Sequence, residues 1–207
     1  MRALRMLCLH GFRGSGEALR AQMRKLVAGL ESELELLTPD APARRAGAPG
    51  WWNAMPLEGA AKHYEGWELT RDWATSFFAN SPPIDGIFGF SQGAALAGLL
   101  VGLRSGTGTP TIAQPLSFGF AIMVGGFVSN DPAHAALYES RTSFALPNLH
   151  MIGRADSVVP SEASRALAAR FESPQLLEHD GGHTIASTPE ARSTFSEFLK
   201  SRAAKRP

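Results

Sequence analysis

The pentapeptide Gly-Phe-Ser-Gln-Gly at residues 89–93 constrains this chain more than any other feature of its sequence. An apolar run at 84–88 precedes it, and small apolar residues at 94–100 follow it. This order predicts a buried strand, a sharp turn and a helix, with the hydroxyl of Ser91 exposed at the turn. Glycines at the turn would let the strand and the helix pack closely. The free N–H groups of the helix start would favour negative charge beside the serine.

The pentapeptide by itself admits two interpretations. An ordinary strand-to-helix turn with a capping serine would show the same residues. A nucleophilic serine needs more: a base, an acid that orients the base, and two donors for an oxyanion, supplied largely by other segments. Those groups, if the chain holds them, favour nucleophilic chemistry at Ser91.

Two later segments supply an acid and a base. Asp156 follows a predicted strand at 149–153, and His183 lies in a glycine-rich loop before the last predicted helix. The order serine, aspartate, histidine is that of α/β-hydrolases. We therefore predict that Asp156 orients His183 and that His183 takes the proton of Ser91. Each residue alone also fits an ordinary loop position, but three roles filled in order favour the triad.

Other residues compete for these roles and are less well placed. Asp131 and Asp180 are alternative acids. None of the remaining histidines lies in the loop before the last helix, where this order requires the base: His10, His63, His134, His150 and His179.

The sequence also indicates an oxyanion hole and a pocket. The two hydrogen-bond donors of the oxyanion hole are predicted to be the backbone N–H groups of Gln92 and of Phe12, with Arg13 as an alternative to Phe12. The glycine-rich segment at 14–16 matches neither the phosphate-binding pattern G-x-x-x-x-G-K-[ST] nor the dinucleotide-binding pattern G-x-G-x-x-G, so nucleotide binding is not expected. Three aromatic residues are candidates for lining an apolar acyl pocket, with core packing or loop anchoring as the alternative: Trp51, Trp52 and Phe127.

Strand and helix patterns alternate along the chain, which predicts a mostly parallel sheet with helices on both faces and a site at the carboxyl ends of its strands. We predict one α/β domain over 1–207, with a long Pro-, Gly- and Ala-rich loop at 39–56 near the site, a second loop at 105–117, a short helix within 129–145 and a frayed basic tail at 201–207. The predicted strands are 4–9, 34–38, 84–90, 118–124, 149–153 and 176–178. The predicted helices are 17–30, 64–78, 92–104, 161–171 and 188–200.

The composition limits the kinds of partner and cofactor that the chain is expected to bind. Twenty basic residues against 19 acidic ones give a net charge of +1, which does not favour a nucleic-acid surface. The single cysteine, Cys8, excludes an intrachain disulfide and is expected to be a buried thiol. No segment has the length and apolarity of a membrane span, so a cytoplasmic protein is expected. No residue spacing requires a metal or other cofactor.

Taken together, these segments resemble the FSH family of serine hydrolases, and especially the branch that contains the human ovarian-cancer-associated hydrolase. The matching residues are 7–12, the tryptophan pair at 51–52, 85–97, 149–153 with Asp156 and 159–160, and 181–183. The resemblance implies an α/β-hydrolase fold without a large cap, hydrolysis of carboxylic esters or thioesters, and catalytic roles for Ser91, Asp156 and His183. The chain departs from the family pattern at 41–50 and 129–145, which leaves substrate preference open.

Two alternatives remain at this point. Acyl-protein thioesterases and related carboxylesterases also carry Gly-Phe-Ser-Gln-Gly, although glycine usually follows it where this chain has Ala94. A non-catalytic binding module on the same scaffold is the other, because fold alone does not determine function. The sequence does not identify the physiological substrate, and it does not show whether that substrate is an ester or a thioester. It also leaves open whether the chain forms a homodimer and whether the 39–56 loop moves as a lid.

Overall fold

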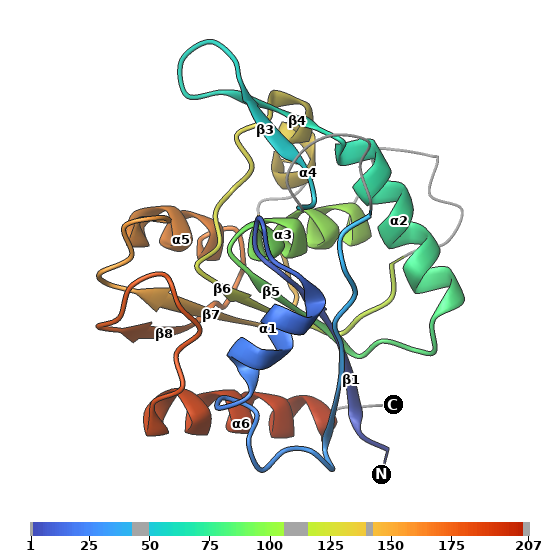
Figure 1. Cartoon of the computed structure of the whole chain (residues 1–207), viewed down its shortest axis with the longest axis vertical. Coiled ribbons are helices and arrows are strands. Elements are labelled where there is room, and N and C mark those ends of the chain that lie inside the picture. Colours follow the sequence, from blue (N-terminus) through green and yellow to red (C-terminus); the bar gives the residue numbers. More distant parts are fainter. Residues whose placement is uncertain (1, 43–49, 106–115, 140–142, 205–207) are drawn as a thin grey trace.

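The computed structural model describes residues 2–42, 50–105, 116–139 and 143–204. Within them, six parallel strands form one sheet in the order β2-β1-β5-β6-β7-β8 (Figure 1). This confirms the predicted α/β class. The strands of the sheet are β1 (Leu4–Leu9), β2 (Leu34–Leu37), β5 (Gly86–Phe90), β6 (Phe120–Val124), β7 (Asn148–Gly153) and β8 (Gln175–His179).

Helices cover both faces of the sheet, as predicted. Alternate residues of β1 show the two faces: Leu7 and Leu9 join one buried cluster, whereas Met6 and Cys8 join the other. Burial on both faces explains why the central strands β5 and β6 are continuously apolar. The helices on the Leu7 side are α2 (Trp67–Asn80), α3 (Gln92–Ser105), α4 (Ala135–Glu139) and α5 (Ser161–Ala168); those on the Met6 side are α1 (Gly16–Met23) and α6 (Pro189–Ala203).

A β-hairpin that the sequence analysis missed follows the tryptophan pair. Strands β3 (Asn53–Pro56) and β4 (Lys62–Glu65) pair antiparallel and stand out at the top of Figure 1. The helix predicted from residue 64 therefore begins only at Trp67, after Gly66 in the left-handed region (φ 88°). The hairpin is held by the chain that follows β6, because Asn130 and Asp131 accept the N–H groups of Lys62 (2.9 Å) and Tyr64 (2.7 Å).

Several predicted boundaries were wrong. The helix predicted at 17–30 ends at Met23 and continues as turns that still bury Leu26 and Leu30, so the helical spacing marked a buried face rather than an unbroken helix. Helix α6 runs to Ala203, so residues 201–203 are helical rather than frayed. The predicted short helix within 129–145 is present as α4, preceded by the 3₁₀ turn Pro132–His134.

Parts of the predicted loops at 39–56 and 105–117, and the end of the tail, lie outside the described residues. Within the described ranges, no helix combines the length and apolar character needed to cross a bilayer.

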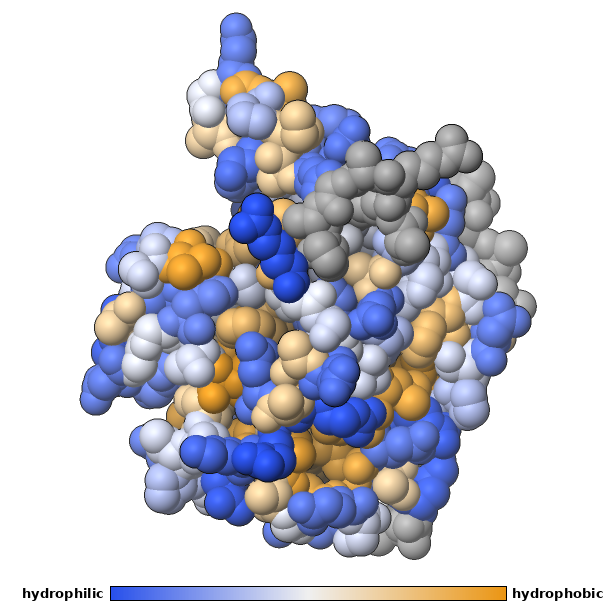
Figure 2. Space-filling model, in the orientation of Figure 1, coloured by the Kyte–Doolittle hydropathy of each residue, from blue (hydrophilic) through white to orange (hydrophobic). Residues whose placement is uncertain are grey.

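An open groove lies at the β2 edge of the sheet, and Figure 2 shows an apolar hollow in the lower part of the visible face. Its volume is about 690 Å³. Apolar side chains between α1 and β2 line it, and charged residues of the same segments surround them: Val27, Leu30, Leu34 and Leu36 among the former, Arg20, Arg24, Glu31 and Glu35 among the latter. Val27 and Leu36 are half-buried there, whereas Leu30 and Leu34 are buried.

The contact between α3 and β1 leads to a first prediction. A Cβ atom on Gly93 would overlap the carbonyl oxygen of Leu9, and this oxygen can move only if β1 moves. On the same helix, a Cβ on Gly98 would meet only the flexible end of Leu167, at 3.0 Å, and the hydroxyl of Tyr138. We expect Gly93→Ala to lower the free energy of unfolding by at least about 2 kcal/mol. Gly98→Ala, the matched control, should change it by less than about 1 kcal/mol. Urea unfolding monitored by circular dichroism measures both values, and equal midpoints for the two variants would contradict the proposed tight contact.

Candidate active site

Ser91 lies at the turn between β5 and α3 in a strained backbone conformation. Its φ of 56° falls in the left-handed region, which residues other than glycine rarely occupy. The turn is held from both sides: the N–H of Ser91 donates to the carbonyl of Val124 (2.8 Å), and its carbonyl accepts from Ala94 (2.9 Å) and Ala95 (3.0 Å). Neighbouring strand and helix bonds therefore impose a geometry that would otherwise be unfavourable.

Asp156 and His183 form a short, shielded pair. The Nδ1 atom of His183 lies 2.6 Å from Oδ2 of Asp156, whose side chain is only 2% exposed. The other carboxylate oxygen, Oδ1, accepts the N–H groups of Val158 (2.9 Å) and Val159 (2.8 Å). Burial alone would raise the pKa of Asp156, but the bonds from His183 and the two amides outweigh it and hold that pKa below its ordinary value. Because Nδ1 is occupied by the carboxylate, Nε2 is the ring nitrogen left for another partner.

The pair and the serine come together around the end of β6. A Cβ on Gly125 would lie 3.1 Å from Cε1 of His183 and 3.4 Å from Oδ2 of Asp156. The residue before it, Val124, accepts the N–H of Ser91, and the ring of Phe90 packs against the ring of His183 with centroids 4.9 Å apart. The structure thus brings the three predicted residues to one place. Gly125 has a φ of 56°, which glycine adopts without strain, and its lack of a side chain leaves room for the ring of His183.

Both predicted oxyanion donors lie beside Ser91. The turn after β1 closes with a bond from the N–H of Gly14 to the carbonyl of Gly11 (3.0 Å), and a Cβ on Gly11 would lie 3.3 Å from Cβ of Ser91. Gln92 follows the serine directly. Within the described part of the chain, the N–H groups of Phe12 and Gln92 donate to no protein acceptor.

The structure places the two tryptophans in the core rather than on the wall of an open pocket. Trp51 and Trp52 have 0% and 1% of their surface exposed. The Trp52 ring stacks on Tyr64 with centroids 4.6 Å apart, and Trp51 tilts against Trp73 at 5.0 Å. Their burial does not fit the predicted role as pocket lining, and the alternative of core packing or loop anchoring describes them. Phe127, which is half-buried two residues after Gly125, keeps that candidate role.

The competing histidines have other surroundings. His150 is buried in β7, where burial lowers its pKa to about 3. His134 is buried against Trp67 and contacts the hydroxyl of Ser129 (2.8 Å). His63 is exposed, with Nδ1 3.4 Å from Asp131, an acid that instead holds the backbone of β4 and the 3₁₀ turn. His10 lies inside the turn after β1, and His179 ends β8.

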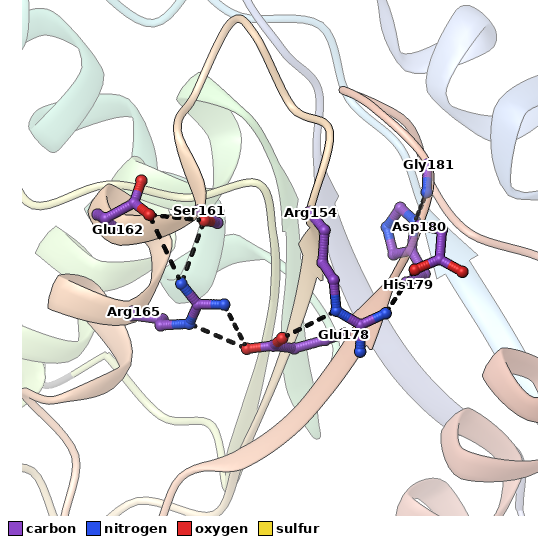
Figure 3. Close-up of polar contacts among 8 residues, drawn as sticks. All are labelled: Arg154, Ser161, Glu162, Arg165, Glu178, His179, Asp180 and Gly181. Carbon is purple, nitrogen blue, oxygen red and sulfur yellow. Dashed lines mark hydrogen bonds and ion pairs between the residues drawn. The ribbon is translucent and has the colours of Figure 1, made fainter.

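Ion pairs join the loops that carry the acid and the base, and sequence reasoning did not identify them (Figure 3). Arg154 reaches Asp180 (2.6 Å) and Glu178 (3.3 Å), and Arg165 of α5 also contacts Glu178 (2.9 Å). Backbone bonds run in parallel, from the N–H of Arg154 to His179 and from that of Ala155 to Gly181. No local pattern signals these pairs, because their partners lie 13 to 26 residues apart in the sequence and come from different elements.

Comparison with known proteins identifies the family. A family model described as serine hydrolase (FSH1) matches residues 1–195. The chain belongs to this serine hydrolase family. Esterase OVCA2 of Xenopus tropicalis is 34% identical to it over 220 residues, which cover 96% of this chain and 93% of the relative. The human esterase OVCA2 is 32% identical, with 96% of each chain covered. These matches confirm the resemblance seen in the sequence and show that this FSH-family chain is an esterase-type hydrolase.

Solved structures agree on the fold. The crystal structure of Zea mays acyl-protein thioesterase 2 superposes with a TM-score of 0.69 at 21% identity, covering 98% of this chain and 94% of that one. The crystal structure of esterase PE8 gives a TM-score of 0.68 at 24% identity, with 97% and 93% covered. At such identities the likeness establishes the α/β-hydrolase architecture alone. The family resemblance implied a fold without a large cap domain, and the described residues of this FSH-family member contain none.

The short bond between Asp156 and His183 predicts a pH-dependent contribution to stability. The folded pKa of Asp156 lies below its ordinary value near 3.8, so its charged form is favoured by folding. This stabilisation is complete above that ordinary value and is lost as the pH falls through the lower folded pKa. The wild type should therefore exceed Asp156→Asn in free energy of unfolding at about pH 5, and the difference should shrink as the pH falls below about 4. Urea unfolding at several pH values from about 5 downward measures it; a difference that grows over this acidic range would contradict the assignment.

The ion pairs around Arg154 generate another expectation. Arg154→Gln should lower kcat by about twofold to fivefold at low salt, because exposed ion pairs contribute only modestly to holding two loops together. Added salt should narrow the gap between variant and wild type, because it screens the same charges. Arg165→Gln is the matched control, since Arg165 contacts Glu178 but not Asp180 on the base loop. Ester-hydrolysis rates at low and high salt test this, and an equal loss in both variants would count against bracing by Arg154.

Proposed function

We propose that this hydrolase cleaves carboxylic esters of apolar acyl groups through a covalent acyl-serine intermediate. Ser91 is the nucleophile, His183 the base and Asp156 the residue that orients the base. The observation that carries the proposal is the 2.6 Å contact between His183 and the buried Asp156, at the same edge of the sheet as a strained serine. A carboxylate, an imidazole and an alcohol in that arrangement are the parts that nucleophilic acyl transfer needs.

In the first half of the proposed reaction, Nε2 of His183 accepts the proton of the Ser91 hydroxyl as its oxygen attacks the acyl carbon. Negative charge then develops on the former carbonyl oxygen, and the N–H groups of Phe12 and Gln92 stabilise it. Asp156 holds Nδ1–H toward itself and stabilises the imidazolium. The intermediate collapses as His183 returns the proton to the alcohol that leaves, and the acyl group stays on Ser91.

In the second half, a water molecule takes the place of the departed alcohol. His183 accepts a proton from this water as its oxygen attacks the acyl carbon of the ester on Ser91. The same two amides stabilise the second oxyanion. Collapse breaks the bond to Ser91, whose oxygen recovers a proton from His183, and the carboxylic acid is released.

The surroundings favour an apolar acyl group. Phe12 and Val158 expose 46% and 66% of their surface on the oxyanion turn and the acid loop, and Phe127 lies just after Gly125. Apolar side chains on the segments that carry the catalytic groups can cover an acyl chain but offer no partner to a charged one. A thioester undergoes the same two steps, and the choice between the two leaving groups depends on measured rates.

The proposed nucleophile is tested by covalent labelling and turnover. A fluorophosphonate should label the wild type at one serine, and Ser91→Ala should abolish labelling. Hydrolysis of p-nitrophenyl esters should fall by about 10⁴-fold in His183→Ala and by a similar factor in Asp156→Asn. Mass spectrometry of the labelled peptide identifies the serine, and initial rates give the loss.

The matched control is Ser129→Ala, which removes a hydroxyl from the segment after β6 and should keep labelling and turnover. Labelling that persists in Ser91→Ala would refute the nucleophile. Rates measured over a series of ester and thioester chain lengths test the substrate class. A preference for anionic acyl groups would refute the apolar pocket, and absence of turnover across the series would favour the binding module.

A further inference from the structure

We propose that Trp51 and the side chain of Gln92 are positioning residues that hold the two oxyanion N–H groups in fixed relation to each other. The inference rests on the proposed function, since it concerns how the same oxyanion hole is built. The two donors come from separate segments: Phe12 belongs to the turn after β1, and Gln92 begins α3. The segment at 50–52 bonds to both of these segments.

The first connection runs from the segment to the start of α3. The Gln92 side chain is buried and uses both ends of its amide: Oε1 accepts the N–H of Trp51 (3.0 Å), and Nε2 donates to the carbonyl of Trp52 (2.8 Å). The two bonds of this amide resemble the pair of N–H···O bonds that two opposite residues exchange in a β-sheet. It locks the residue whose own N–H is the second oxyanion donor, because the side chain and the backbone N–H share one Cα.

The second connection runs from the segment to the turn after β1. The indole Nε1–H of Trp51 donates to the carbonyl of His10 (2.7 Å), and the two rings lie 4.9 Å apart. His10 Nδ1 in turn donates to the carbonyl of Gly11 (2.8 Å), while Nε2 accepts the N–H of Ala41 (3.0 Å), which requires the neutral ring. Burial lowers the pKa of His10 and keeps it in that form. The peptide groups that precede Phe12 are therefore fixed from the interior.

The segment itself is anchored and passes very close to both donor residues. Thr70 of α2 donates its hydroxyl to the carbonyl of Trp51. A Cβ on Gly50 would lie 2.7 Å from Cδ2 of Phe12 and 2.9 Å from Oε1 of Gln92, so a side chain at this position would displace one of these two side chains. Helix α2, the segment and the two donor turns thus form one continuous buried network.

This arrangement would affect the rate rather than substrate binding. An oxyanion exists only in the tetrahedral states, so donors held in place lower the barrier without binding the substrate more tightly. If the indole N–H is removed, the His10 carbonyl is left buried without its partner, and the turn that presents Phe12 is free to shift. A shift of about 1 Å can cost on the order of 100-fold in rate.

The test compares two tryptophans that touch each other. Trp51→Phe removes the N–H that bonds His10 but keeps an aromatic ring. Trp73→Phe makes the same change in the neighbouring ring, which contacts Trp51 and Phe77 and is not part of the network. Rates are normalised to active sites counted by fluorophosphonate labelling at its end point, so that misfolded protein does not contribute. The second readout is affinity for an acyl aldehyde or boronic acid, which forms a tetrahedral adduct with Ser91.

We expect Trp51→Phe to lower kcat by about 10-fold to 100-fold with KM changed by less than about threefold. Affinity for the aldehyde or boronic acid that forms the tetrahedral adduct should fall by the same factor as kcat. Trp73→Phe should leave both values near those of the wild type. If Trp51→Phe does not fold, Gln92→Met decides, since it keeps a similar volume but removes both bonds to the segment, and the same parallel loss is expected.

Wild-type kcat and adduct affinity in the decisive variant would overturn the inference while leaving the proposed function intact. A loss confined to KM would also overturn it, because that result indicates a role in substrate binding. Failure of the proposed function is a separate result, in which the wild type itself neither hydrolyses esters nor takes the label at Ser91.

Discussion

The site depends on one steric constraint, the contact of the start of α3 with the end of β1. Gly93 lies against the carbonyl of Leu9, and Gly89 lies against the backbone of Gly93, so that strand, turn and helix occupy a space in which no side chain fits. This contact places Ser91 beside the turn after β1, where a Cβ on Gly11 would lie 3.3 Å from Cβ of Ser91. Helix start, serine and oxyanion turn are consequently set by backbone packing, which is stiffer than any arrangement of side chains.

The acid and the base are set by a second regularity, the adjacency of β7 and β8. Parallel neighbours end at the same edge of a sheet, so the loops that leave them run side by side. Backbone bonds from Arg154 and Ala155, and the ion pair to Asp180, then join these loops. The short contact between Asp156 and His183 thus lies on two segments that support each other, and the exposed charges add only a modest part of that support.

The tryptophan pair has a different role from the one that the composition of its segment suggested. Two indoles next to a proposed hydrolytic site suggest a wall for an acyl chain, yet both rings are buried and their segment bonds to Gln92, His10 and Thr70. In our proposal the segment at 50–52 supports the oxyanion donors from the buried side. Exposed apolar surface near the site comes instead from Phe12 and Val158, which neither periodicity nor spacing could identify.

The sequence by itself determined the alternation of strands and helices, the serine turn, the order of Ser91, Asp156 and His183, and the family. These features are local, since they follow from apolar runs, glycines at turns and motifs a few residues long. Only the tertiary structure decided that Trp51 and Trp52 are buried, that a hairpin precedes α2, that the first helix stops at Met23, and that Arg154 pairs with Asp180. Each of these depends on which distant residues meet, and burial and hydrogen-bond partners are properties of the packed chain that local pattern does not contain.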